Sequence, residues 1–399
     1  MAHYFIFPEK DATIYSHPDR SKMNTGQDEI LELVKEPGST DQHHHPSRIL
    51  IAFNNEDIKT AHNLIGSEIF NNENLPTTAS VTLQLTVAET KNLVSTHNIN
   101  VYAVSQSWTE GTGRYLNLPT GSNGCSWVYR NNSTTATHWT GSSDVNYFGP
   151  NGHGTGSIPA SATGVLEQGG GVWYTGSKFV ATQQFLEGDS LDTMFEVKSI
   201  VAKFSASLFA NNPIPTGIPN NGFLLKMPDS VEADASSSFG EIQYFSVDTH
   251  TIYPPKLVFK WDDSSYTLPD GKEVISGSIN VSLYNNREEY NQNDEALFRI
   301  HVREKYPTRT FVNQAQGSNY LNVGYLTTSS FYSIRDAHSE REIVPFDDYT
   351  KLSADEKGMF FKIYIKGLQP ERYYRLLFKT INNDGTRIYD DKYFFKVVR

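Results

Sequence analysis

The residues of this 399-residue chain that could do chemistry are histidines, paired aspartates and tryptophans. His43-His44-His45 is the first candidate, because imidazole is a common metal ligand. Neighbouring side chains of a strand point to opposite faces, so three adjacent imidazoles cannot converge on one ion. Asp41 is close by, but no cysteine or second histidine pair stands at a recognised ligand spacing. The pattern favours a solvated loop, and we expect neither a metal nor a cofactor.

Two aspartate pairs, Asp262-Asp263 and Asp347-Asp348, could offer carboxylates to Ca²⁺. Neither pair has the glycine and further acids of a loop-type calcium site, so solvated turns are the expectation. The chain contains no Gly-x-Ser-x-Gly or His-Glu-x-x-His motif, and Cys125 has no motif around it. Gly169-Gly170-Gly171 follows no strand–helix pattern and is not a phosphate loop. Carboxylate pairs of glycosidases come from distant strands, so 45 acidic residues alone are no evidence for one. We expect no enzymatic activity.

The tryptophans are the one suggestive group. Between residues 107 and 176 the sequence is dominated by Gly, Ser, Thr and Asn, and four of the five tryptophans fall there. Aromatic faces stack on sugar rings, which makes Trp127, Trp139, Tyr147 and Trp173 candidate glycan or partner contacts. The alternative is that these rings form the core of a segment that is poor in Ile, Leu and Val.

Composition favours a protein made of strands. The chain has 23 Phe, 22 Tyr, 28 Gly and 18 Pro, the profile of short strands joined by many turns. Its net charge of −11 argues against nucleic acid as a partner. A single cysteine excludes an intrachain disulfide, the N-terminus lacks the pattern of a secretory signal, and no apolar run is long enough to span a membrane.

The first part of the chain is read around Ile49–Phe53, a short apolar run bounded by turn-forming residues that predicts a strand buried on both faces. Residues 2–8 predict an exposed or docking strand, an N-terminal arm that invites pairing with a neighbouring chain. Glu56–Ile69 predicts a short helix, and Gln27–Lys35 suits a helical turn or an edge strand. Further strands are predicted at Ser80–Ala88, Ile99–Val104, Lys178–Phe185, Thr193–Leu208, Gly222–Lys226, Gly240–Ser246 and Lys256–Lys260.

A polar, turn-rich stretch at Trp261–Gly271 predicts the domain boundary, giving domains 1–265 and 273–399. Leu368, Pro370 and Tyr374 have the spacing of a tyrosine corner, and Asn382–Gly385 is a hairpin signal. Seven strands in about 125 residues predict an immunoglobulin- or fibronectin-III-like β-sandwich. They are Ser278–Tyr284, Ala296–Arg303, Phe331–Asp336, Glu342–Phe346, Met359–Ile365, Tyr373–Ile381 and Lys392–Val398.

Two stretches of the first domain carry a resemblance, Asn24-Thr25-Gly26 and Trp108-Thr109-Glu110-Gly111-Thr112-Gly113. With Asp11–Ile14, Arg48–Phe53, Val81–Leu85, Ser126-Trp127, Asn221–Leu225 and Pro254–Leu257, they resemble the DNRLRE family of carbohydrate-binding β-sandwich modules over residues 9–261. The resemblance implies a jelly-roll-like sandwich. The chain departs from the family pattern by a long insertion between Trp127 and Trp173.

The C-terminal motifs Phe331–Ile334, Val344–Ser353 and Gln369–Tyr374 resemble a domain of virion structural proteins of contractile-tailed marine cyanophages. This implies an all-β structural component of the tail, baseplate or neck, made in the host cytoplasm and located in the virion. Its expected partners are other virion proteins and further copies of itself in a symmetric assembly. The alternatives are a glycan-binding host-adhesion protein and an accessory module of a carbohydrate-active enzyme.

Overall fold

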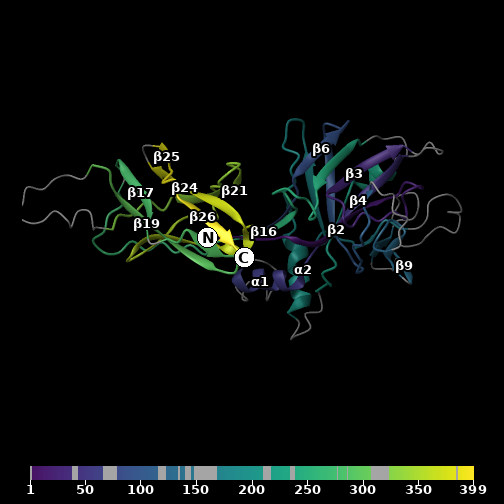
Figure 1. The fold of residues 1–399 in the computed structure, drawn as a ribbon, viewed down its shortest axis with the longest axis horizontal. Helices are drawn as coiled ribbons and strands as arrows, with labels where there is room; N and C mark the ends of the chain where they lie inside the picture. The colour runs from purple at the N-terminus through teal and green to yellow at the C-terminus, as the bar shows by residue number, and fades with distance from the viewer. Residues whose placement is uncertain are drawn as a thin grey trace, which may run out of the picture. The chain divides into compact units, whose positions relative to one another are not determined.

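The computed structural model describes residues 2–37, 44–65, 79–115, 123–133, 135–139, 145–147, 169–209, 217–233, 239–275, 277–284, 286–306, 323–382 and 385–399 (Figure 1). Strands dominate these residues, which confirms the all-β fold class. The chain forms two compact units. The first is Ile6–Val258, and the second combines Phe259–Arg399 with Met1–Phe5. The division precedes the turn-rich stretch at Trp261–Gly271.

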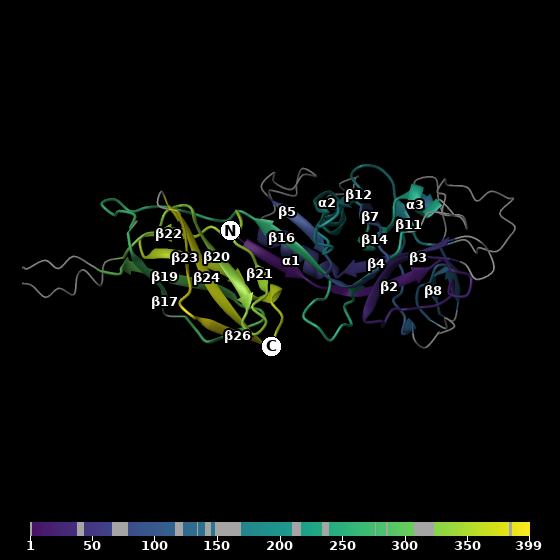
Figure 2. The same ribbon diagram turned by 90° about the horizontal axis from the view of Figure 1, so that it is seen from above.

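The first unit is built on an eight-stranded sheet with β4 near its centre (Figure 2). The strand order is β12-β7-β14-β4-β3-β15-β6, and β2 pairs with β4. The bounds are β2 Pro8–Tyr15, β3 Ile30–Pro37, β4 His44–Phe53, β6 Val87–Lys91, β7 His97–Ala103, β12 Val180–Phe185, β14 Phe223–Lys226 and β15 Glu241–Phe245. Ile49–Phe53 of β4 are buried, as the apolar run predicts, and the burial extends back to His45.

Smaller elements complete the fold. A four-stranded sheet has the order β1-β16-β5-β13, and two hairpins pair β8 with β9 and β10 with β11. Residues 2–5 and 259–261 of the four-stranded sheet belong to the second unit. The bounds are β1 Ala2–Ile6, β5 Ser80–Gln84, β8 Tyr129–Asn132, β9 Ala136–His138, β10 Val145–Tyr147, β11 Val172–Tyr174, β13 Phe195–Glu196 and β16 Lys256–Trp261; the helices are α1 Asn55–Ile65, α2 Lys198–Leu208 and α3 Asp229–Ala233. Helix α1 confirms the predicted helix, and β3 resolves the ambiguous stretch as a strand.

Two strand predictions in this unit are wrong. Ser80–Ala88 is not one strand, because the chain leaves β5 after Gln84 and enters β6, in the other sheet, at Val87. Most of Thr193–Leu208 is helix α2. Residues 200–206 of this helix are all buried, Lys203 and Ser205 included, so this stretch lacks the exposed face of an amphipathic helix.

The predicted N-terminal arm docks on its own chain. Strand β1 lies beside β16, and Ala2, Tyr4 and Phe5 are buried. Met1–Phe5 belongs to the second unit although it precedes the first in the chain. Of the two alternatives for this stretch, a docking strand is the one observed.

The second unit consists of two sheets packed through aromatic rings. The first has the order β17-β19-β23-β22, and the second β18-β26-β24-β20-β21, with β25 also paired to β24. Phe361 of β23 stacks on Tyr332 of β20 at 4.5 Å, and Phe298 of β19 contacts Phe395 of β26 at 5.6 Å. The bounds are β17 Ile279–Tyr284, β18 Glu289–Asn291, β19 Glu295–Glu304, β20 Ser330–Asp336, β21 Glu342–Val344, β22 Ser353–Asp355, β23 Gly358–Tyr364, β24 Arg372–Asn382, β25 Gly385–Tyr389 and β26 Phe394–Val398.

Each of the seven strands predicted here overlaps an observed one, but the hairpin signal leads into β25, which the sequence did not predict as a strand. The predicted tyrosine corner is confirmed by the Tyr374 hydroxyl, which donates to the Gln369 carbonyl at 2.9 Å.

Tyr374→Phe should destabilise the second unit by about 1–2 kcal/mol, because the Gln369 carbonyl loses a buried hydrogen bond while the ring packing remains. Urea denaturation measures the loss. The neighbouring Tyr373→Phe is the matched control, because Tyr373 is exposed. Equal denaturation midpoints for the two variants would contradict the corner's role.

Candidate functional site

The tryptophans singled out by the sequence lie inside the first unit. Trp127, Trp139 and Trp173 are 1–2 % exposed and belong to one core cluster with residues of β2, β4 and β14. The Trp139 indole donates to the Ser126 carbonyl at 2.9 Å. The backbone of Tyr147 lies in β10, and its side chain is outside the described residues. The three buried rings have no face open to a sugar, so they form a core, which is the alternative that the sequence left open.

A buried ionic cluster lies against two of these rings. The Arg48 guanidinium is 4.5 Å from the Trp127 ring and 5.2 Å from the Trp173 ring. Glu232 of α3 accepts from Arg48 at 2.7 Å and pairs with Lys226 of β14 at 3.0 Å. All three charged side chains are fully buried. The cluster thus ties β4, β14 and α3 to the tryptophan core.

The glycine run is part of the same cluster. Arg48 Nη1 donates to the Gly170 carbonyl at 2.5 Å. Gly170 has a φ of +87°, and a Cβ there would lie 2.4 Å from that guanidinium nitrogen. Glycine is required at this position because the backbone approaches a buried side chain, and not because it binds a phosphate.

The histidine and aspartate candidates have structural contacts. His45 is buried with its ring 5.3 Å from that of His17, and His43 and Asp41 lie outside the described residues. Asp347 pairs with His3 and with Lys260, each at 3.1 Å. Asp262 accepts from the backbone and hydroxyl of Ser264. Within the described part of the chain, no group of three or more His, Cys, Asp or Glu side chains could hold a metal ion.

The two motif segments of the first unit meet around Asn24. Its side-chain amide donates to the carbonyls of Glu110 and Cys125 at 2.5 and 2.8 Å, and its side-chain oxygen accepts from the Gly113 amide at 2.7 Å. Gly111 has a φ of +90°, and a Cβ there would lie 2.3 Å from the Asn24 oxygen. The spacing of these glycines therefore serves close packing around one asparagine.

Two carboxyl groups near Asn24, those of Glu110 and Asp11, have pKa values above the ordinary range. Burial raises the pKa of Glu110 to about 7, and the negative charge of Asp248 adds to the rise. Burial also raises the pKa of Asp11 well above its ordinary value. The Asp11 amide donates to Glu110 Oε1 at 3.2 Å, and the Val247 amide donates to Asp11 at 2.7 Å.

Glu110→Gln should make the stability of the first unit less dependent on pH between about 4.5 and 7. The folded pKa of Glu110 is raised, so the wild type loses stability as pH rises from 4.5 towards 7, where the unfolded chain ionises first. At pH 8 the variant should be more stable by about 1–3 kcal/mol, and near pH 4.5 the gain should vanish. Urea denaturation at several pH values measures this. Exposed Glu9→Gln is the control, and a pH-independent difference for Glu110→Gln would contradict the expectation.

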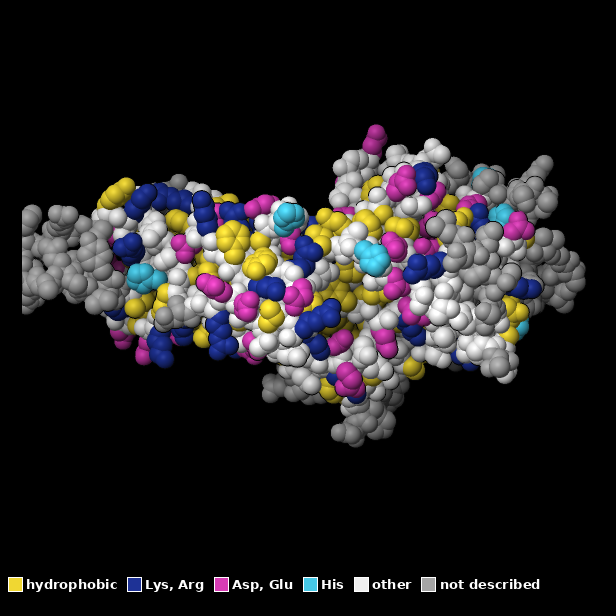
Figure 3. All heavy atoms as spheres, in the orientation of Figure 1, with side chains coloured by type: hydrophobic (Ala, Val, Ile, Leu, Met, Phe, Trp, Pro, Cys, Tyr) yellow, Lys and Arg dark blue, Asp and Glu magenta, His cyan; other side chains and the backbone are white. Residues whose placement is uncertain are grey.

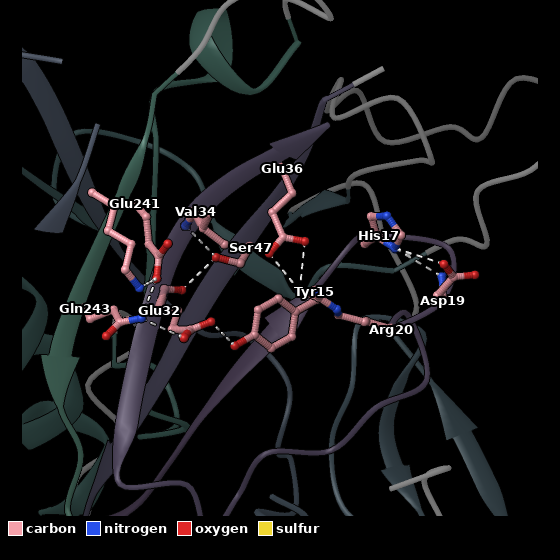
Figure 4. Close-up of polar contacts among 11 residues, drawn as sticks. Tyr15, His17, Asp19, Arg20, Glu32, Val34, Glu36, Ser47, Glu241 and Gln243 are labelled. Atoms are coloured by element: carbon pink, nitrogen blue, oxygen red, sulfur yellow. Dashed lines mark hydrogen bonds and ion pairs between the residues drawn. The ribbon is translucent and has the colours of Figure 1, made fainter. Parts of the chain in front are cut away.

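An array of partly exposed polar side chains lies on β3 and β15 (Figure 4). The Tyr15 hydroxyl donates to Glu32 at 2.6 Å, and the Gln243 amide donates to Glu32 at 3.1 Å and also to Glu241. We call Arg20, Glu32, Glu36, Tyr115, Glu241 and Gln243 the polar face. Leu33 and Ile242, on the opposite side of these strands, are fully buried.

Arg20 extends the polar face toward an aromatic ring. It donates to both carboxylate oxygens of Glu36 at 2.7 and 2.8 Å, and its guanidinium lies 4.9 Å from the Tyr115 ring centre. Burial raises the pKa of Glu32, and the negative charge of Glu241 acts in the same direction. Partly exposed carboxylate, amide and guanidinium groups beside a tyrosine can hydrogen-bond to hydroxyl-rich ligands.

Sequence reasoning missed the polar face. The available signal was the alternation of Glu32 and Glu36 with Leu31 and Leu33, which indicates a strand with one polar side. That signal does not place Gln243 or Arg20 beside these glutamates, because neither is a neighbour in the sequence.

No protein-family model and no curated protein matches this chain. Among the described residues, no helix is both long and apolar enough to cross a membrane.

Proposed function

We propose that this chain is a non-enzymatic structural component of a tailed-phage virion, in the tail, baseplate or neck, which acts through protein–protein contacts. The resemblance of Phe331–Tyr374 to virion proteins motivates the proposal. The structural observation behind it is the set of large apolar side chains exposed on one sheet of the second unit, among them Tyr373, Ile388 and Phe394. Exposed apolar patches on a folded protein mark interaction surfaces.

The finer architecture belongs to the same proposal. We take the first unit as a jelly-roll-like sandwich and the second as immunoglobulin- or fibronectin-III-like. The tyrosine corner at Tyr374 and the two aromatic-packed antiparallel sheets support the second assignment.

The direct test is the composition of the particle. Mass spectrometry of gradient-purified particles from the phage that encodes this chain should find it at constant stoichiometry. Immunogold labelling with antibodies against the purified chain should place it on the tail or neck. Absence of the chain from particles that contain the other structural proteins would overturn the proposal. Polysaccharide cleavage by the purified chain at an enzyme-like rate would do the same.

A second candidate function is glycan binding by the polar face. It is favoured by the partly exposed carboxylate, amide and guanidinium groups beside Tyr115. Gln243→Ala and Arg20→Ala should then abolish binding on a glycan array, whereas Arg130→Ala, at a guanidinium that bonds to Ser107 and is not part of the polar face, should not. Binding that survives both changes would exclude the polar face as its site.

A further inference from the structure

In the described part of the second unit, four of the seven exposed large apolar side chains lie on the outer side of one sheet. Along β24, Tyr374, Leu376 and Phe378 point into the core, whereas Tyr373 and Ile381 point outward and are 58 % and 42 % exposed. Register places Phe394 of β26 opposite Arg375 and Ile388 of β25 opposite Lys379. We call Tyr373, Arg375, Lys379, Ile381, Ile388 and Phe394 the β24 face.

The four apolar side chains of the β24 face are exposed to solvent. Phe394 is 42 % exposed and Ile388 is 59 % exposed. Tyr373 and Ile381 are eight residues apart on one strand, so the face extends about 26 Å. Apolar side chains lie among basic and acidic ones on the surface of the second unit (Figure 3). A surface of this length with four large apolar side chains is expected to be covered in the functional assembly.

The two cations of the β24 face already have contacts within the unit. Arg375 forms an ion pair with Glu340 at 2.5 Å and a second with Asp390. Lys379 lies 4.8 Å from the centre of the Phe331 ring. The face therefore presents both signs of charge beside its apolar side chains, a pattern that can match a copy of itself when Arg375 of one copy meets an acidic group of the other.

The distribution of charge between the two units favours the same partner. Residues 259–399 contain 20 basic and 20 acidic residues, and residues 1–258 contain 14 basic and 25 acidic residues. The whole net charge of −11 thus lies in the part of the chain that forms the first unit. Two copies that approach through their first units repel each other, whereas two neutral second units do not.

We propose that the β24 face is a self-association surface through which two copies of this chain pack on each other in a two-fold arrangement. The inference deepens the proposed function, on which it rests, by naming the partner and the surface. A stable contact of this kind needs about 800 Å² from each copy. The β24 face offers apolar side chains near both of its ends, with Arg375 and Lys379 between them.

Sedimentation equilibrium of the full chain at concentrations of about 1 to 100 µM tests the proposal. The wild type should dimerise in this range. Tyr373→Lys and Ile388→Lys should each weaken the dimer by about tenfold or more, because each places like charges opposite one another in the two copies. Leu297→Lys is the matched control, since Leu297 is 47 % exposed on β19 in the other sheet. Unchanged circular dichroism and melting temperature must accompany each variant.

Several outcomes would overturn the inference. The inference is overturned if the wild type stays monomeric at about 100 µM. It is also overturned if the Leu297→Lys variant dimerises as weakly as the β24-face variants. If the chain is monomeric but the β24-face variants fail to enter particles, the partner is a different virion protein and self-association is rejected. If the chain is absent from particles yet dimerises through this face, the proposed function fails and the inference stands.

Discussion

Tyr4→Ala should lower the melting temperature of the second unit by about 10 °C or more, because replacing a buried aromatic residue by alanine costs about 3–5 kcal/mol. Tyr4 is 1 % exposed in β1, and its ring packs edge-on against Tyr364 at 6.3 Å. Its neighbour Phe5 is also buried, and His3 bonds to Asp347 at 3.1 Å. The first residues of the chain therefore supply core to the unit that is completed last.

Tyr306→Ala is the matched control for Tyr4→Ala, since Tyr306 is 76 % exposed in the same unit, lies outside the β24 face and should cost less than about 0.5 kcal/mol when lost. Hydrogen exchange should show faster exchange in peptides from residues 330–382 for the Tyr4 variant. Equal melting temperatures for the two variants, or faster exchange confined to the first unit, would show that β1 does not contribute to the second unit's core.

The elements that the sequence predicted well are those whose pattern is local. Ile49–Phe53 of β4 read as a buried strand because a short apolar run bounded by turn-forming residues fits a central strand. Tyr374 was predicted correctly because a tyrosine corner closes onto Gln369, only five residues upstream. Seven strands of the second unit followed from alternation in the same way, whereas the short strands β18, β22 and β25 were not predicted.

What the sequence could not predict depends on distant partners. Whether Trp127 faces solvent or a core is decided by Arg48, and Arg48 is held by Glu232, which is 184 residues away. The docking of His3 depends on Asp347, which is 344 residues away. Short-range spacing carries no information about such contacts. Helix α2 was missed for a related reason, since residues 200–206 are buried without interruption, Lys203 and Ser205 included, and so show no helical period of burial.

Glu232→Gln should destabilise the first unit by about 3–5 kcal/mol, because it leaves Arg48 and Lys226 as buried cations without their shared carboxylate. The substitution preserves side-chain shape, so the loss reports charge and not packing. Since Arg48 also holds the Gly170 carbonyl, peptides from residues 123–133 and 169–174 should exchange hydrogen faster. Urea denaturation gives the free energy of unfolding. Exposed Glu89→Gln, at a carboxylate 3.5 Å from Lys91, is the control and is expected to change it by less than about 0.5 kcal/mol.

Adding Lys226→Met to Glu232→Gln separates an electrostatic cause from a steric one. The second substitution removes the buried Lys226 ammonium, which still pairs with Asp229 at 2.5 Å, and keeps an apolar chain of similar length beside Trp173, whose ring centre is 5.4 Å from that ammonium. If buried charge is the cause, the double variant should be more stable than Glu232→Gln alone by about 1–2 kcal/mol, since it removes a buried cation that has lost one of its carboxylate partners. A double variant that is less stable than either single one would show that Glu232 acts through packing, and the tryptophan core would then not depend on the ion cluster.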